Sequence, residues 1–127
     1  MRALLDTSFF VATAAGRPLG ELTGVTETEV SVVTIAELTV GVLVAGDEQR
    51  AARVATLSAV ESTWDPLPVD AEVARQFAHI VAALRAERRR VPVLDALLAA
   101  TAIVQQIPLI TQDDGFGVIP GIEVIRV

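Results

Sequence analysis

The sequence contains no cysteine and no lysine, and it has only one histidine and one tryptophan. Without cysteine the chain can form neither a disulfide nor a thiolate metal site, which fits a cytoplasmic protein. The one histidine, His79, has no second histidine one helical turn away, so the sequence offers no zinc site of the usual kind. No apolar run reaches the ~18 residues that a membrane-spanning helix requires, and we expect no membrane partner.

The length and the hydrophobic content of the chain are typical of a folded domain. The chain has 127 residues, of which 52% are hydrophobic, so we expect residues 1–127 to form one domain around one core. The net charge of −6 excludes nucleic-acid binding through a broad basic surface. Every basic residue is an arginine, whose forked guanidinium group suits phosphates and carboxylates. A compositional bias of the source genome also explains this exclusive use of arginine.

The N-terminal segment predicts a strand that ends in an acid. Ala3, Leu4 and Leu5 form an apolar run without polar alternation, which is typical of a strand buried on both faces of a parallel sheet. Asp6 then lies at the carboxyl end of that strand, where open α/β sheets bind their ligands. Thr7 or Ser8 can cap the following helix or hydrogen-bond a neighbouring carboxylate. The alternative is that Asp6 is only a turn or capping residue.

A second acid, Glu37, has two interpretations. The β-branched segment 30–33 predicts a second strand, and Thr34 follows it as a candidate N-cap. Thr34 and Glu37 have the spacing of a capping box, which would explain Glu37 without any function. The other interpretation places Glu37 at the same edge of the sheet as Asp6.

A run of arginines follows the apolar stripe of a helix that Asp70 is expected to cap. We expect this helix to end in residues 85–90, where Arg88, Arg89 and Arg90 would complement the negative end of the helix dipole. The same three side chains are candidates for contact with an RNA phosphate backbone. We refer to them as the arginine run.

Two further acids lie at the ends of predicted elements. Asp95 falls in the first turn of an apolar helix expected over 91–103, where a charge is costly unless it is paired or bound to a metal. Asp113 and Asp114 follow a predicted strand over 107–110. An extended segment over 63–69, which contains two prolines, predicts an edge strand.

The predicted elements form an α/β fold with a central, mainly parallel sheet of about four to five strands flanked by helices. Such a fold gathers four carboxylates at one edge of the sheet, namely Asp6, Glu37, Asp95 and Asp113. Bare carboxylates in one cleft repel each other, and a hard cation such as Mg²⁺ or Mn²⁺ removes that conflict. Because Mg²⁺ often binds together with substrate phosphate, a phosphodiester is the natural substrate. A phosphoacceptor receiver domain would need a lysine, which is absent, and an Asp-x-Asp phosphatase would need a second acid where Ser8 stands.

The acids lie in four sequence blocks that resemble the signature blocks of PIN-domain ribonucleases. The blocks are Leu4-Leu5-Asp6-Thr7-Ser8, Val33-Thr34-Ile35-Ala36-Glu37-Leu38 with Gly41, Asp95-Ala96-Leu97-Leu98-Ala99-Ala100-Thr101-Ala102, and Leu109-Ile110-Thr111-Gln112-Asp113-Asp114-Gly115-Phe116. Each block is weak alone, but four in order are specific and span essentially the whole chain. The chain length is also similar to that of the VapC toxins of toxin–antitoxin pairs.

The resemblance implies a three-layer PIN domain with the activity of a Mg²⁺- or Mn²⁺-dependent endoribonuclease. It implies that Asp6, Asp95 and Asp113 hold the metal, that Glu37 completes the catalytic site, and that Ser8 and Thr111 orient the carboxylates. It further implies a homodimer, an RNA substrate and a VapB-type antitoxin that blocks the cleft. Many family members carry another acid where this chain has Gly115; either Asp114 replaces that acid beside the metal ligands, or it is simply a solvated side chain. The alternative is a non-catalytic module whose acidic cleft captures an arginine-rich partner peptide.

Overall fold

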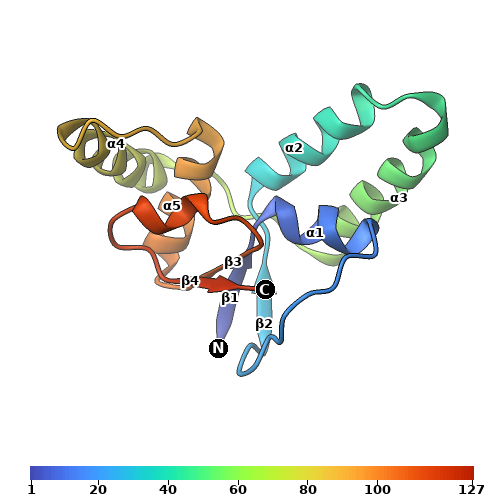
Figure 1. Ribbon diagram of the computed structural model, residues 1–127, viewed down its shortest axis with the longest axis horizontal. Coiled ribbons are helices and arrows are strands. Elements are labelled where there is room, and N and C mark those ends of the chain that lie inside the picture. Colours follow the sequence, from blue (N-terminus) through green and yellow to red (C-terminus); the bar gives the residue numbers. More distant parts are fainter.

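The computed structural model describes all residues 1–127 as one sheet with helices on both faces (Figure 1). The elements in chain order are β1 (Arg2–Leu5), α1 (Thr7–Ala14), β2 (Glu27–Glu29), α2 (Val32–Leu43), α3 (Asp47–Thr63), α4 (Ala71–Ala86), α5 (Val93–Gln105), β3 (Leu109–Thr111), the 3₁₀ turn η1 (Gly115–Val118) and β4 (Val124–Arg126). No helix is both long and apolar enough to span a bilayer.

The sheet has four strands in the order β2-β1-β3-β4, and all of its pairings are parallel. The N-terminal strand β1 is therefore central, with Leu4 opposite Glu29 on one side and Leu109 on the other. Parallel strands keep all their carboxyl ends at the same edge. The predicted α/β class and parallel sheet are confirmed.

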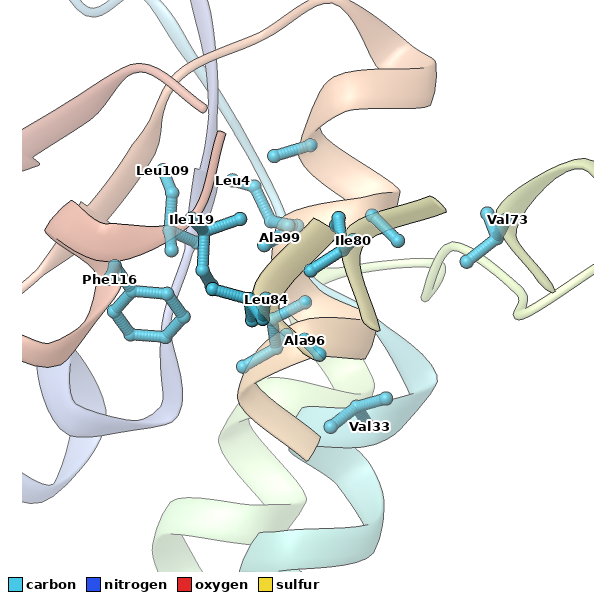
Figure 2. Close-up of a cluster of buried hydrophobic side chains, with 13 residues drawn as sticks. Leu4, Val33, Val73, Ile80, Leu84, Ala96, Ala99, Leu109, Phe116 and Ile119 are labelled. Carbon is cyan, nitrogen blue, oxygen red and sulfur yellow. The ribbon is translucent and has the colours of Figure 1, made fainter. Parts of the chain in front are cut away.

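Strand β1 explains how the three layers form. Its residues alternate between the two faces, as strand geometry requires, so Leu4 packs on one side while Ala3 and Leu5 pack on the other. All three are at most 1% exposed, as the unbroken apolar run predicts. Leu4 joins residues of α4 and α5, including Ile80 (Figure 2). The opposite face is covered by α1 and α3.

The structure corrects the assignments around the second strand. Strand β2 comprises only Glu27–Glu29, so segment 30–33 is not the strand that we predicted. Helix α2 is capped by Ser31, whose side chain accepts a hydrogen bond from the Val33 amide at 3.0 Å. Thr34 lies inside the helix, and the capping box is therefore wrong. The serine fills the cap one turn earlier and leaves Thr34 free for a tertiary contact.

The predicted edge strand over 63–69 is also wrong. Only Leu67 pairs, through a single parallel bridge to Ser31. The Leu67 amide donates to the Val30 carbonyl at 2.8 Å, and its carbonyl accepts from Val32 at 3.0 Å. Pro66 and Pro68 flank it and lack the N–H groups that a longer ladder requires.

Helix α4 begins at the Asp70 cap, as predicted, but ends before the arginine run. Its last residue is Ala86, and Arg88 follows in the left-handed conformation with φ 57°. The Arg88 amide donates to the Arg85 carbonyl at 3.0 Å, and the Arg89 amide donates to the Leu84 carbonyl at 2.8 Å. These two bonds form a Schellman C-cap. The arginine run therefore lies in the loop after the helix.

Candidate active site at the carboxyl edge of the sheet

Four acids lie around the carboxyl edge of the sheet, each placed by a different element. Asp6 directly follows β1, and Asp113 comes two residues after the adjacent parallel strand β3. Glu37 projects from the second turn of α2, and Asp95 lies in the first turn of α5. The acids are close enough that Asp6, Glu37 and Asp113 each raise the pKa of Asp95. We call these four residues the acidic site.

Asp6 is held by hydroxyl groups rather than by cations. It is only 3% exposed, and its Oδ2 accepts hydrogen bonds from Ser8 Oγ and Thr111 Oγ1, both at 2.7 Å. Neither bond involves Oδ1. Because no buried side-chain oxygen lacks a partner, Oδ1 must reach the solvent of the cleft. One oxygen of Asp6 is therefore fixed by the protein and the other is available to a ligand.

The same hydroxyl groups also position the loop that carries Asp113. The Gln112 amide donates to Ser8 Oγ at 3.0 Å, and the Asp113 amide donates to Thr111 Oγ1 at 2.9 Å. Each hydroxyl accepts from a backbone amide and donates onward to Asp6, which defines the direction of both bonds. Ser8 and Thr111, which were expected to orient a carboxylate, thus both contact Asp6.

Glu37 has its own hydroxyl support. Thr7 Oγ1 donates to Glu37 Oε1 at 2.7 Å and lies 3.0 Å from Thr34 Oγ1. The sequence predicts Thr34 as a helix cap, whereas its hydroxyl group contacts Thr7. The spacing Thr34-x-x-Glu37 was the relevant signal, but it reflects one helical face turned toward Thr7 rather than a cap.

Burial and mutual repulsion disfavour the charged forms of two of these acids. The pKa of Asp95 is raised to about 6, chiefly by burial and then by the charges of Asp6, Glu37 and Asp113 in that order. Burial also raises the pKa of Glu37, assisted by Asp6 and Asp113, while the bond from Thr7 opposes the change. Strong perturbation of grouped carboxylates in a cleft is typical of functional sites.

No arginine neutralises the acidic site. The five ion pairs of the protein all lie elsewhere, and none includes any of the four acids. As the side chains stand, no group of three or more His, Cys, Asp or Glu residues is arranged to hold a metal ion. Mg²⁺ does not need such a cage, because it typically binds through one or two carboxylates and completes its shell with water and phosphate. The oxygen-only donors and the free Oδ1 of Asp6 fit such an ion.

The sequence profile described as the PIN domain matches residues 3–122. Ribonuclease VapC5 of Mycobacterium tuberculosis is 44% identical over 98% of this chain and 94% of that protein. The chain belongs to the VapC group of the PIN-domain family. Ribonuclease VapC4 of the same species is 39% identical over 99% of this chain and 97% of its own length.

A solved structure supports the same placement of this VapC-group chain. The VapBC-5 toxin–antitoxin structure from M. tuberculosis contains a chain that matches with a TM-score of 0.87 and 40% identity. The match covers 99% of this chain and 98% of that chain. The four-stranded parallel sheet is therefore that of a PIN domain, and the predicted family and three-layer fold are confirmed.

Asp114 has a different environment in this PIN domain from the one we expected. Its carboxylate forms an ion pair with Arg126 of β4, and it is not among the acids that affect the pKa of Asp95. The Arg126 guanidinium also donates to the Gln112 carbonyl at 2.9 Å. Asp114 thus ties the loop after β3 to the neighbouring strand, outside the acidic site.

Trp64 is half-buried and packs against the core of this VapC-group chain. Its indole N–H donates to the Thr28 carbonyl at 3.0 Å, and its ring meets Phe10 edge-to-face at 5.4 Å. The lone histidine, His79, is exposed on α4.

A cavity adjoins the acidic site of this PIN domain. It has a volume of about 510 Å³ and lies between α1, α2 and α3. Its lining includes Glu37 of the acidic site, apolar groups such as Val11 and Leu38, and the charged residues Glu48 and Arg53. It therefore combines apolar surface with charged groups of both signs, two of them acids.

Proposed function

We propose that this chain is a metal-dependent endoribonuclease that acts as the toxin of a toxin–antitoxin pair. The observation that carries the proposal is the acidic site itself: four carboxylates lie close together at the carboxyl edge of the sheet, two have a raised pKa, and no arginine pairs with any of them. The relatives named Ribonuclease VapC5 and VapC4 support the activity. Cytoplasmic RNA needed for translation, whether tRNA, rRNA or mRNA, is the proposed substrate.

The proposed ligands of Mg²⁺ or Mn²⁺ are Asp6, Asp95 and Asp113. When bound, such an ion supplies a Lewis acid for the phosphoryl oxygen and lowers the pKa of bound water. The protein holds Asp6 rigidly through Ser8 and Thr111, so this carboxylate enters the reaction already oriented.

Glu37 is proposed to accept the proton of the attacking water. Its pKa is raised by burial and by neighbouring acids, which makes its carboxylate a stronger base near neutral pH. Thr7 holds one oxygen, Oε1, at 2.7 Å, and no protein group donates to Oε2, which is thus free to take the proton. The proton passes from the water oxygen to Oε2 as that oxygen attacks phosphorus. The P–O bond to the leaving ribose oxygen breaks, and that ribose oxygen takes up a proton from solvent.

We also propose a VapB-type antitoxin as partner, in line with the VapBC complex that this chain resembles. The cavity beside the acidic site offers apolar groups for a docked segment and acids for an arginine on it. Such a segment would cover Glu37 and block the substrate path.

RNA cleavage by the purified, antitoxin-free protein tests the proposal. We expect the wild type to cut a structured RNA in Mg²⁺ or Mn²⁺, to stop in EDTA, and to lose at least about 100-fold in rate on Asp95→Asn or Asp6→Asn. Asp65→Asn is the matched control, because Asp65 is exposed and forms no side-chain hydrogen bond or ion pair.

A non-catalytic binding module would give a different result. Neither acid variant would then alter the RNA, and titration of Mn²⁺ would release no heat that depends on Asp6 or Asp95. Either normal cutting by both variants or that calorimetric result would end the nuclease proposal.

A further inference from the structure

We propose that Arg88 and Arg90, assisted by Arg85, bind the phosphate backbone of the RNA strand that enters the acidic site. This inference rests on the proposed nuclease function and adds a substrate-binding surface to it. We call these three residues the cationic loop end.

The three side chains are free to bind a ligand. None of them forms an ion pair or a side-chain hydrogen bond, and all are exposed. The arginines elsewhere are largely engaged: Arg2 pairs with Glu29, Arg50 with Asp47, and Arg126 with Asp114, while Arg53 bonds Gly41 and Gln49. Only Arg17 and Arg75 are also unpaired, and they are isolated in the sequence. Within the arginine run, Arg89 is the exception, at 3.8 Å from Glu87.

The cationic loop end leads directly to the acidic site. The loop after α4 runs into α5, whose first turn carries Asp95 (Figure 1). Asp95 lies five positions after Arg90 in the chain, a path of at most about 18 Å. An RNA strand whose scissile phosphate lies at Asp95 therefore places phosphates a few nucleotides away within reach of the loop.

Electrostatics shows why a local cation is needed. A protein of net charge −6 with four clustered acids repels a polyanion, and a bound metal ion offsets that repulsion only inside the site. At physiological salt, charges interact over about 8 Å, so a few arginines beside the cleft can act without a basic surface. Guanidinium forks also match phosphate oxygens in geometry.

The backbone at Arg88 supports a role for its side chain. Arg88 occupies the C′ position of the Schellman cap with φ 57°, where glycine is the favoured residue. An arginine here strains the backbone, and nothing in the fold uses its side chain. Gln106, with φ 57° after α5, occupies the same kind of position without a charge. Gln106 is therefore a matched control for Arg88, with the same backbone conformation and no charge.

The experiment replaces each residue with glycine. Arg88→Gly and Gln106→Gly should both raise Tm by about 3 to 6 °C, because both relieve a left-handed backbone. Only Arg88→Gly should weaken binding of a labelled single-stranded oligoribonucleotide, measured in EDTA so that the RNA stays intact. Arg75→Gln controls for the loss of one unpaired arginine elsewhere on α4.

The salt dependence identifies the contact. Each lost phosphate contact should reduce the slope of log affinity against log salt by about 0.7, so the wild type loses about 2.6-fold more affinity than Arg88→Gly between 50 and 200 mM salt. In the double variant Arg88→Gly/Arg90→Gln, the slope should be reduced by about twice as much as in Arg88→Gly. Wild-type slopes in both double and single variants would overturn the proposal, as would reduced binding of the antitoxin with unchanged RNA binding. A wild type that binds RNA through the loop but never cuts it would refute the nuclease function and leave this surface intact.

Discussion

Replacing Asp95 with asparagine should inactivate the protein and stabilise it at the same time. The pKa of Asp95 is raised from 3.8 to about 6 by burial and by three neighbouring acids, so the folded state resists the ionised carboxylate. That difference corresponds to about 3 kcal/mol at a pH above 6. Asp95 is only partly buried, and solvent screening reduces the effect to about 1 to 2 kcal/mol. Asparagine keeps the shape of the side chain and removes the charge.

The pH dependence of the stability difference follows from the direction in which folding shifts the pKa of Asp95. A carboxyl group with a raised folded-state pKa binds its proton more tightly in the folded protein, so its unfavourable contribution grows as pH rises from about 4 to 6 and is complete above that range. We therefore expect Asp95→Asn to be more stable than wild type by about 1 to 2 kcal/mol at pH 7.5 and equally stable near pH 4.

Urea unfolding in EDTA, followed by circular dichroism at both pH values, measures this difference without bound metal. Asp65→Asn should stay within about 0.5 kcal/mol of wild type throughout. If Asp95→Asn were less stable at pH 7.5, or if its advantage were the same at pH 4, the four acids would not repel one another as the structure indicates. The reasoning about the acidic site would then be wrong.

Three other predictions follow from the same geometry. Mn²⁺ at 100 times its Kd should raise the unfolding free energy of the wild type by about 2.7 kcal/mol, which a thermal shift assay measures. A similar gain in the Asp6→Asn variant would exclude Asp6 as a ligand. Thr111→Val removes a buried hydroxyl that joins Asp6 to the Asp113 amide, so it should lower stability by about 1 to 3 kcal/mol and reduce kcat more than it raises KM; a kcat equal to that of the wild type would contradict a positioning role. Phe116→Ala should cost about 3 to 5 kcal/mol in urea unfolding, since Phe116 is 1% exposed within the core beside α4 and α5; a loss below 1 kcal/mol would show that the turn after β3 is not anchored there.

The parallel sheet and the positions of the acids could be predicted because local signals agreed. The apolar run before Asp6 predicts a strand buried on both faces, and β1 is such a strand. Strand ends and helix starts then place acids at one edge whatever the details of the loops. Asp95 could be identified as a candidate because a charge in an apolar helix is energetically costly unless it is paired or bound to a metal. The raised pKa of Asp95 reflects its partial burial.

The partners of Thr111 and of Thr34 could not be predicted from local sequence, because these contacts join residues far apart in the chain; a role for Thr111 beside the carboxylates was implied only by the family resemblance. Thr111 and Asp6 are 105 residues apart, and only the pairing of β1 with β3 brings them together. The cap of α2 was misassigned because Ser31 and Thr34 carry the same local signal, and the contact of Thr34 with Thr7 decides between them. The left-handed conformation of Arg88 has no sequence signal, since glycine is absent there.

The central claim is that the acidic site binds a divalent ion through Asp6 and Asp95. Crystals of the protein soaked in Mn²⁺, with anomalous scattering collected at the manganese edge, test it most directly. We predict an anomalous peak at about 2.0 to 2.3 Å from an oxygen of Asp6 and within reach of Asp95, which disappears in Asp95→Asn crystals. Ordered acids with no peak between them, or a peak bound elsewhere on the surface, would contradict the account.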